Sequence, residues 1–385
     1  MQDVDAASGG GDQSGDDRFR VMVVDDSAVI RGLLTRSLEA DNSIKVVASV
    51  GNGEAALKAL ERQTVDVIIL DIEMPVMDGL TALPKLLAAQ PGVHVVMASA
   101  LTRKNAEVSL RALQAGAADY VTKPSSRSEL TSADTFQREL TAKVKALAGA
   151  NRKAPRPRSQ AAAPAAETAA PASGGGNLYG GRQVVLRKGP MVCPRIIAIG
   201  SSTGGPQALL ELLGDMAARV KVPILITQHM PATFTTLLAE HIARATGVPT
   251  QEGVDGEVVQ PGRIYLAPGD YHMVVERDGT VDRIKLNQNP AENFCRPAVD
   301  PMLRSMASLY GSGLLTIILT GMGSDGQKGS AKVVEAGGSV IAQDEATSVV
   351  WGMPGAVATS GLCSEVLPLK EIGPQVRKLI MRSAA

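Results

Sequence analysis

The chain has 385 residues, 44% apolar and 20% charged, and its 39 basic residues balance its 39 acidic ones. A formal charge of zero excludes a global field that draws the chain to nucleic acid or anionic membrane, and no apolar run approaches the roughly 20 residues of a membrane span. Three widely spaced cysteines exclude a disulfide framework. We therefore expect a cytoplasmic protein of two or three domains with no membrane insertion.

The first 137 residues divide into a tail and a domain. Residues 1–17 are rich in Gly, Asp and Ser, which predicts a disordered tail and not a signal peptide. Short β-rich runs then alternate with amphipathic helical patterns between residues 18 and 137, which predicts a doubly wound (βα)5 domain with a parallel sheet. The expected strands are Phe19–Val24, Lys45–Val50, Val65–Leu70, Val93–Ala98 and Asp119–Thr122, with helices such as Ala28–Glu39 and Glu54–Gln63 between them.

Polar side chains follow four of these strands. Asp25 and Asp26 follow the first strand, Asp71 the third, Ser99 the fourth and Lys123 the fifth. Because the carboxyl ends of parallel strands share one edge, we expect these groups to converge. Three carboxylates repel one another, and a hard divalent cation such as Mg²⁺ relieves that repulsion. With the metal bound, Asp71 can attack a phosphoryl group and Lys123 can neutralise its oxygens.

This pattern resembles the receiver domain of bacterial response regulators over about residues 18–137. The resemblance implies that Asp71 is the phosphoacceptor and that Asp25 and Asp26 hold Mg²⁺ with it. It also implies that Ser99 and Lys123 form the switch pair and that Tyr120 is the switch aromatic. The alternative interpretation is that these polar groups at the strand ends are simply solvated. In that case the occurrence of five such groups at matched strand ends would be a coincidence.

The composition changes after the first domain. A helix expected over Ser132–Ala148 leads out of it, and residues 147–191 are rich in Ala, Pro and Gly, with seven basic residues and one acid, Glu167. Such a segment buries too little surface to offset its ordering entropy, so we interpret residues 138–192 as a linker. A basic interaction segment is the alternative interpretation.

A second α/β alternation occupies residues 193–385. Strands are expected near 196–200, 222–227, 263–267, 314–320 and 338–342. Turn signals at Pro261-Gly262, Pro268-Gly269-Asp270 and Asp278-Gly279 predict β-hairpins inserted in the middle. We therefore expect a second α/β domain with a mostly parallel sheet and an inserted hairpin.

Three apolar strands of this domain end in residues that carry chemistry. Gly200, Ser202 and Gly204 fit the G-x-S-x-G turn, which exposes a serine hydroxyl above a sheet edge. His229 follows the second strand, and Asp325 lies in the loop after the strand near 314–320. A serine needs a base to take its proton, and the base needs a group that orients it. We therefore predict a hydrolase with Ser202 as nucleophile, His229 as base and Asp325 as orienter.

Competing roles exist for these residues. His94 and His241 are expected in a strand and a surface helix of their domains, whereas His272 starts a strand and can line the cleft. Asp325 can instead cap a helix expected over Gln327–Ala336. The amides of Thr203, Gly204 and Met322 are predicted to bind the oxyanion.

The second domain looks like the catalytic domain of CheB-type chemotaxis protein-glutamate methylesterases over about residues 193–380. The motifs that carry the resemblance are Ser202-Thr203-Gly204-Gly205, Gln228-His229-Met230-Pro231, Ala267-Pro268-Gly269-Asp270, Cys295-Arg296-Pro297-Ala298-Val299-Asp300, Gly321-Met322-Gly323-Ser324-Asp325-Gly326 and Gln343-Asp344-Glu345. In that family the serine, histidine and aspartate of these motifs are catalytic, and they map onto Ser202, His229 and Asp325.

The resemblance also implies a biological setting. It implies demethylation of glutamyl methyl esters on methyl-accepting chemoreceptors with release of methanol, deamidation of receptor glutamines, and a CheA-type histidine kinase as phosphodonor in a two-component system for chemotaxis. No cofactor is expected for the esterase chemistry. In the resting state the receiver is expected to cover the cleft, and phosphorylation is expected to release it.

Three other functions fit parts of the sequence. Residues 321–330 nearly match a phosphate-binding P-loop, but an extra residue separates Gly326 from Lys328. A DNA-binding output domain would need a helix-turn-helix and a basic stripe, which residues 193–385 lack. An inert receptor-binding adaptor would not need all three residues of the serine relay.

Overall fold

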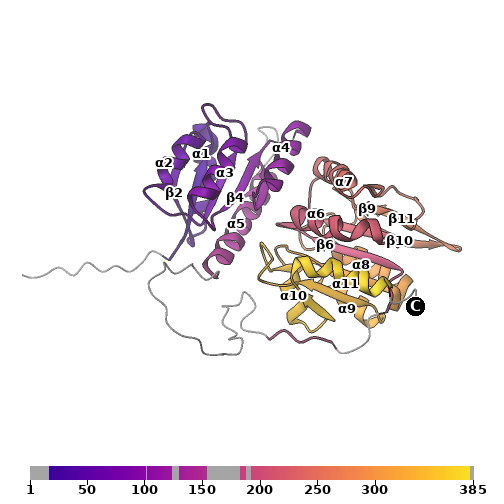
Figure 1. The fold of residues 1–385 in the computed structure, drawn as a ribbon. Helices are drawn as coiled ribbons and strands as arrows, with labels where there is room; N and C mark the ends of the chain where they lie inside the picture. The colour runs from indigo at the N-terminus through magenta and orange to yellow at the C-terminus, as the bar shows by residue number, and fades with distance from the viewer. Residues whose placement is uncertain (1–16, 101, 124–129, 154–182, 188–191, 382–385) are drawn as a thin grey trace, which may run out of the picture.

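The structure is a computed structural model and describes residues 17–100, 102–123, 130–153, 183–187 and 192–381. Two α/β domains stand next to each other, one before and one after the connection near residues 154–191 (Figure 1). The predicted tail, except for Asp17, lies outside the described residues, and so do residues 154–182 and 188–191 of the predicted linker.

The first domain is a parallel five-stranded sheet in the order β2-β1-β3-β4-β5, as the sequence predicts. Its central strands are apolar because helices cover both faces of the sheet. The strands are β1 (Phe19–Val24), β2 (Ile44–Val50), β3 (Val67–Asp71), β4 (His94–Ser99) and β5 (Asp119–Thr122). The helices are α1 (Ala28–Glu39), α2 (Gly53–Leu60), α3 (Gly79–Ala89), α4 (Arg103–Gln114) and α5 (Leu130–Lys153).

Side-chain caps fix the starts of the first four helices. The caps are Ser27, Asn52, Asp78 and Thr102, and each accepts a hydrogen bond from the amide three residues later. These residue types are favoured at this position because their oxygen satisfies an amide that has no partner inside the helix.

Helix α5 corrects one predicted boundary. It continues to Lys153, and Leu140, Val144 and Leu147 on its inner face are fully buried in the core of the first domain. The prediction that a linker begins at residue 138 was therefore wrong for residues 138–153. The alanine-rich composition at the end of this helix concealed an apolar stripe of helical spacing.

The second domain is a seven-stranded parallel sheet in the order β14-β13-β12-β6-β7-β9-β8, and an antiparallel hairpin stands beside it, as predicted. The sheet strands are β6 (Ile196–Ser201), β7 (Ile224–Gln228), β8 (Thr250–Glu252), β9 (Ile264–Leu266), β12 (Leu314–Ile318), β13 (Ser339–Gln343) and β14 (Glu365–Leu367). The hairpin strands are β10 (His272–Asp278) and β11 (Val281–Asn287). The sequence prediction missed β8 and β14, which have three residues each and lie at the sheet edges.

Helices cover both faces of this sheet. The α-helices are α6 (Gly205–Met216), α7 (Ala232–Thr246), α8 (Val299–Tyr310), α9 (Gln327–Glu335), α10 (Met353–Thr359) and α11 (Leu369–Met381), and two short 3₁₀ turns are η1 (Ala217–Arg219) and η2 (Gly311–Gly313). None of the helices in the described ranges has the length and apolar character needed to traverse a bilayer.

The register of the central strands places two predicted site residues side by side. Strand β6 lies between β12 and β7, and its last residue, Ser201, pairs with Gln228 at the end of β7. Ser202 and His229 are the next residues on the two strands. Because neighbouring strands are about 4.8 Å apart, their backbones emerge together from the sheet edge.

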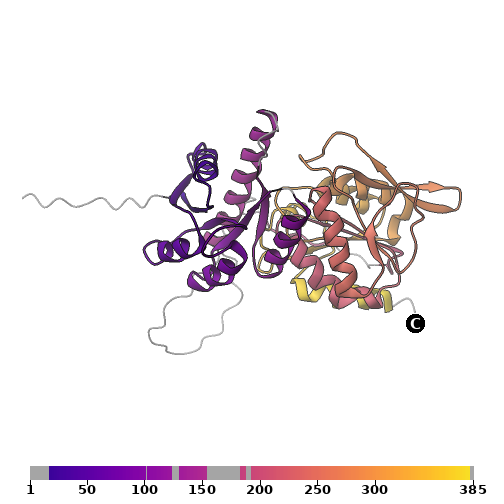
Figure 2. The same cartoon turned by 90° about the horizontal axis from the view of Figure 1, so that it is seen from above.

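The two domains touch where α4 of the first domain packs against α6 and α7 of the second (Figure 2). Tyr120 of β5 stacks on Phe234 of α7, with ring centroids 4.1 Å apart and planes 8° apart. Gln207 of α6 donates from Nε2 to the carbonyls of Leu113 and Ala117 at 2.5 and 2.7 Å. These are contacts between specific, buried or half-buried groups, and they define one docked arrangement of the domains.

Candidate functional site

His229 and Asp325 form a close pair at the carboxyl ends of β7 and β12. The Nε2 atom of His229 lies 2.7 Å from Oδ2 of Asp325, and both side chains are largely buried. The structure thus joins two of the three residues of the predicted relay. This contact also determines that Nδ1 is the nitrogen of His229 that remains for another partner.

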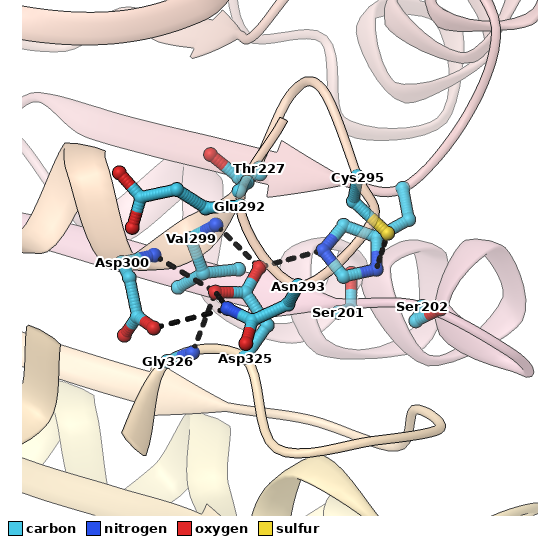
Figure 3. A network of polar contacts seen from close by, with 12 residues as sticks. Ser201, Ser202, Thr227, Glu292, Asn293, Cys295, Val299, Asp300, Asp325 and Gly326 are labelled. Atoms are coloured by element: carbon cyan, nitrogen blue, oxygen red, sulfur yellow. Dashed lines mark hydrogen bonds and ion pairs between the residues drawn. The ribbon is translucent and has the colours of Figure 1, made fainter. Parts of the chain in front are cut away.

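Asp325 is held at the start of α8. Its Oδ2 accepts from the amide of Val299 at 2.6 Å, and its Oδ1 accepts from the amides of Asp300 and Gly326 and from Nδ2 of Asn293 (Figure 3). Burial raises the pKa of Asp325, but the contacts with His229 and with these amides outweigh burial and lower it below its ordinary value. The carboxylate is therefore a fixed negative charge.

The alternative role of Asp325 as the cap of the helix that follows it was wrong, because the side chain acts at a different helix. The cap residue of α9 is Gly326, with φ of +90°, and no side chain caps that helix. Asp325 instead supplies an acceptor to the first amides of α8, which has no side-chain cap of its own. A helix N-terminus favours a negative charge, so the loop and α8 stabilise the carboxylate that orients His229.

Ser202 is half-buried at the end of β6, and its hydroxyl makes no hydrogen bond within the described part of the chain. Its backbone is fixed: its amide donates to the carbonyl of Thr320, and its carbonyl accepts from Nε2 of Gln228. The structure therefore does not show the predicted hydrogen bond between Ser202 and His229. The two residues emerge next to each other at the ends of the paired strands β6 and β7.

A thiol takes the place next to His229 that the sequence assigned to Ser202. Sγ of Cys295 lies 3.4 Å from Nδ1 of His229. Burial lowers the pKa of His229, but the neighbouring Cys295 and Asp325 raise it to about 10. Sequence reasoning used Cys295 only as part of a family motif and missed this contact. The cysteine belongs to a loop, and no periodic pattern relates its position to that of the imidazole.

Asn293 and Asp300 are further members of this network that the sequence did not single out. Nδ2 of Asn293 bridges Oδ1 of Asp325 and Oδ2 of Asp300 at 2.9 and 3.1 Å. Burial and the charge of Asp325 raise the pKa of Asp300. The amide of Gly329 donates to Oδ1 of Asp300, so this second carboxylate ties α9 to α8. The network restricts the loop that carries Cys295.

The groups predicted to bind an oxyanion lie around Ser202. Thr203 and Gly204 follow it directly, and Gly204 starts α6 with φ of +76° and no side-chain cap. In the described part of the chain the amides of Thr203, Gly204 and Met322 donate to no protein acceptor. Free amides at the start of a helix suit a developing negative charge.

The first domain reaches into this part of the site. The hydroxyl of Thr203 donates to Oδ2 of Asp119 at 2.5 Å, and both residues are buried. Lys143 of α5 lies 3.2 Å from the same carboxylate. On the other side of the site the guanidinium of Arg138 lies 4.5 Å from the ring centroid of Phe294, the residue before Cys295. The sequence did not identify Asp119 as a site residue, because only polar residues at the carboxyl ends of strands were considered and Asp119 is the first residue of β5.

The remaining histidines do not join the network. His272 is buried, accepts from the amide of Ala298 and lies 3.1 Å from the carbonyl of Pro290 through Nε2, which makes it a structural link between loops. His94 lies in β4, where burial lowers its pKa. His241 lies on α7, 3.3 Å from Gln114 of the first domain. His229 is therefore the histidine that can serve as base.

The acidic cluster of the first domain forms as predicted from the strand ends. Ligand oxygens of Asp25, Asp26 and Asp71 lie within 4.8 Å of one another. Lys123 bridges Asp25 and Asp71, with Nζ 2.6 Å from each carboxylate. Burial raises the pKa of Asp71, and Lys123 opposes that effect. Three clustered carboxylates are a donor set that fits Mg²⁺, because that ion prefers oxygen ligands and relieves their repulsion.

The predicted switch residues connect the acidic cluster to the domain interface. Ser99 is buried at the end of β4, and its hydroxyl accepts from the hydroxyl of Ser109 on α4 at 3.2 Å. Tyr120 is buried between Phe234 and Lys143, and burial raises the pKa of its phenol well above the ordinary value. Both α4 and β5 face the second domain.

Comparison with known proteins gives consistent matches to both domains. Residues 21–134 match the family model described as response regulator receiver domain, and residues 197–376 match that described as CheB methylesterase. A protein-glutamate methylesterase/protein-glutamine glutaminase from Rhodospirillum centenum is 60% identical over 384 residues, which cover 97% of each chain. Another from Azospirillum brasilense is 57% identical and covers 96% of this chain and 95% of that protein.

Solved structures include a likeness to the second domain. The CheB methylesterase catalytic domain of Thermotoga maritima is 40% identical, with a TM-score of 0.47, and covers 49% of this chain and 100% of that one. The sequence identity over nearly the full length decides the assignment. The chain belongs to the CheB methylesterase family, in the form that carries an N-terminal receiver domain.

Proposed function

We propose that this protein is a phosphorylation-controlled serine hydrolase that removes methyl esters from glutamyl side chains of chemoreceptors and deamidates receptor glutamines. The observation that carries the proposal is the His229–Asp325 pair at the strand ends beside Ser202. The relatives that are named protein-glutamate methylesterase/protein-glutamine glutaminase support the same reaction class. The three cysteines are unpaired, which supports action in the cytoplasm.

The proposed reaction begins when the ring of His229 turns from Cys295 to Ser202. Nδ1 takes the proton of the hydroxyl, and Oγ attacks the ester carbonyl, while Asp325 holds Nε2. The amides of Thr203, Gly204 and Met322 bind the oxyanion, and each such donor contributes on the order of 3 kcal/mol to transition-state stabilisation. Methanol leaves with the proton from His229. Water, activated by the same imidazole, then hydrolyses the acyl-enzyme.

Methanol release tests this function directly. Membranes that carry methylated chemoreceptors are incubated with the full-length protein, with and without acetyl phosphate, and methanol is measured. We expect release in both conditions and faster release with the phosphodonor. Absence of release in both conditions would contradict the proposed esterase.

In the docked arrangement the receiver is proposed to inhibit the esterase. Asp119 holds the hydroxyl of Thr203, next to the nucleophile, and Tyr120 is stacked on Phe234. Substrate cannot approach Ser202 closely while the receiver residues occupy these positions. A shift of about 1.4 kcal/mol in the balance between docked and undocked forms changes activity tenfold.

Phosphorylation of Asp71 is proposed to weaken this docking. Asp25, Asp26 and Asp71 would hold Mg²⁺, which neutralises phosphoryl charge during transfer from a CheA-type histidine kinase. The phosphoryl group adds about −1.5 to −2 charge beside Lys123. The hydroxyl of Ser99, which accepts from Ser109, can then turn to donate to the phosphoryl group. This turn weakens its contact with Ser109 and frees α4 to move against α6 and α7.

Asp71→Asn is expected to remove stimulation by acetyl phosphate while basal release of methanol remains, because the amide cannot form the acyl phosphate. The measurement is the ratio of methanol release with and without acetyl phosphate and Mg²⁺. Asp78→Asn is the matched control, since asparagine also caps helices and Asp78 caps α3. Undiminished stimulation of the Asp71 variant would place the phosphoacceptor elsewhere, and stimulation that survives EDTA would contradict the metal requirement.

Gln207→Ala is expected to raise basal activity without a phosphodonor. It removes two hydrogen bonds between the domains, each with a net contribution of about 0.5–1.5 kcal/mol, which predicts a gain of roughly fivefold or more. Gln375→Ala is the control, because Gln375 bonds Glu365 within the second domain. Equal basal activity of the Gln207 variant and the unmodified protein would contradict inhibition by docking.

A further inference from the structure

Cys295 has the surroundings of an activated nucleophile. Its sulfur contacts Nδ1 of His229, and the other nitrogen of that ring contacts the buried carboxylate of Asp325. This is the sequence of contacts, nucleophile to base to orienting acid, that activates nucleophilic side chains in hydrolases. Ser202, which was expected at the first position, has no hydrogen-bond partner for its hydroxyl in the described residues. The mechanism proposed above leaves the thiol without a chemical role.

The contact gives the thiol a proton acceptor within hydrogen-bond reach. The pKa of His229 is raised to about 10, because the effects of Cys295 and Asp325 outweigh burial of the ring. The ring is therefore a strong proton acceptor, and the imidazole beside the thiol can take its proton and leave the nucleophilic thiolate. Cys295 is half-buried, so part of the residue is exposed to solvent. Thiolates, not thiols, react with peroxides and electrophiles.

The two other cysteines lack these surroundings. Cys363 is completely buried, and burial raises the pKa of its thiol to about 12. Cys193 is half-buried, but its sulfur contacts only the backbone carbonyls of Pro194 and Ile380, at 3.9 and 4.0 Å. The chain thus contains one half-buried reference thiol, Cys193, and one buried reference thiol, Cys363, for Cys295.

We propose that Cys295 is an oxidation site through which a hydroperoxide reversibly switches off the esterase. The inference rests on the proposed function in one respect: His229 must be the base that Ser202 needs. The second part of the inference is that this thiol reacts selectively with peroxide, and it depends only on the contact between Cys295 and His229.

The chemistry balances with one peroxide per thiolate. Sulfur attacks one peroxide oxygen, the S–O bond forms and the O–O bond breaks. The leaving hydroxide takes the proton of His229 and departs as water, so sulfur is oxidised by two electrons and the peroxide is reduced by two. The product is a sulfenic acid beside Nδ1, and a thiol reductant restores the cysteine. The oxygen added to the sulfur occupies the approach of the ring to Ser202, and the base cannot serve the hydroxyl.

The test uses the full-length protein and hydrogen peroxide. After brief treatment and removal of peroxide with catalase, methanol release is compared with the untreated sample, and sulfenic acid is trapped with dimedone and located by peptide mass spectrometry. We expect labelling of Cys295 roughly 30-fold faster than of Cys193, since an ordinary thiol is only a few per cent thiolate near neutral pH. Activity should fall in proportion to labelling and return with dithiothreitol.

Variants identify the residue responsible. Each variant is compared with its own untreated activity. Cys295→Ser should retain that activity after peroxide, whereas Cys193→Ser and Cys363→Ser should lose it as the unmodified protein does. His229→Gln should slow labelling of Cys295 by about the same 30-fold factor, because the imidazole that takes the proton of the thiol is gone.

Two results would overturn the proposal. One is inactivation of Cys295→Ser by peroxide to the same extent as the unmodified protein. The other is labelling of Cys295 no faster than that of Cys193. If the untreated protein releases no methanol, the esterase function fails, but the labelling rates and their dependence on His229 still decide whether this thiol is activated.

Discussion

Ser202→Ala is expected to abolish methanol release from methylated receptors while the fold remains intact. Loss of the nucleophile of a serine relay reduces turnover by roughly 10⁵–10⁶-fold. The hydroxyl of Ser202 has no hydrogen-bond partner in the described residues, so its removal leaves no buried group unsatisfied. Methanol release is measured together with the thermal unfolding temperature, which should be unchanged.

Ser201→Ala is the matched control for this prediction. Ser201 is buried, and its hydroxyl donates to Oε1 of Gln228 at 2.6 Å, so its loss acts on packing and not on the nucleophile. We expect it to cost at most about 1–3 kcal/mol of stability and to leave most of the turnover. Substantial methanol release by the Ser202 variant, or an equal loss in both variants, would contradict the assignment of Ser202.

Asp325→Asn is expected to lower turnover about 10⁴-fold, the loss typical of an orienting aspartate in a serine relay. The amide keeps the size of the side chain but removes the charge that stabilises the imidazolium. It also loses an acceptor, although the amides of Val299, Asp300 and Gly326 and Nδ2 of Asn293 still need one. The variant should therefore also be less stable. Turnover and unfolding temperature are measured together.

Asp300→Asn separates chemistry from structure. Asp300 is buried in the same network and accepts from Gly329 and Asn293, but within the described residues it makes no hydrogen bond or ion pair with His229. The Asp300→Asn variant should be less stable than the unmodified protein. It should lose no more than about tenfold in turnover, which corresponds to about 1.4 kcal/mol of activation free energy. If both variants lose turnover to the same degree, Asp325 acts through the network and not on the imidazole.

The sequence predicted the strands well, and it also predicted which edge of each sheet carries the site residues. Both depend on local patterns along the chain. The apolar run Phe19–Val24 and the polar residues that follow it were read correctly as a strand and its carboxyl end. The acidic cluster of the receiver followed from the same argument, since parallel strands bring their ends to one edge. The pair of His229 and Asp325 followed in the same way from β7 and β12.

The features that the sequence did not predict depend on contacts between distant elements. The hydrogen bond between Asp119 and Thr203 joins residues of different domains, and no sequence pattern around either residue indicates this contact. Cys295 lies in a loop whose course is determined by the contacts of Asn293 and Asp325. The inner face of α5 was missed because alanine-rich composition resembles that of the linker beyond it.

The contact between Asp119 and Thr203 also has a consequence for the upstream signal. If a receptor segment and the receiver compete for the same position beside the nucleophile, thermodynamic linkage requires the effect to be reciprocal. Saturation with methylated receptor should therefore shift the equilibrium of phosphorylation at Asp71 by the same factor by which phosphorylation strengthens receptor binding. A high level of methylated receptors would in this way promote phosphorylation of the enzyme that removes their methyl groups.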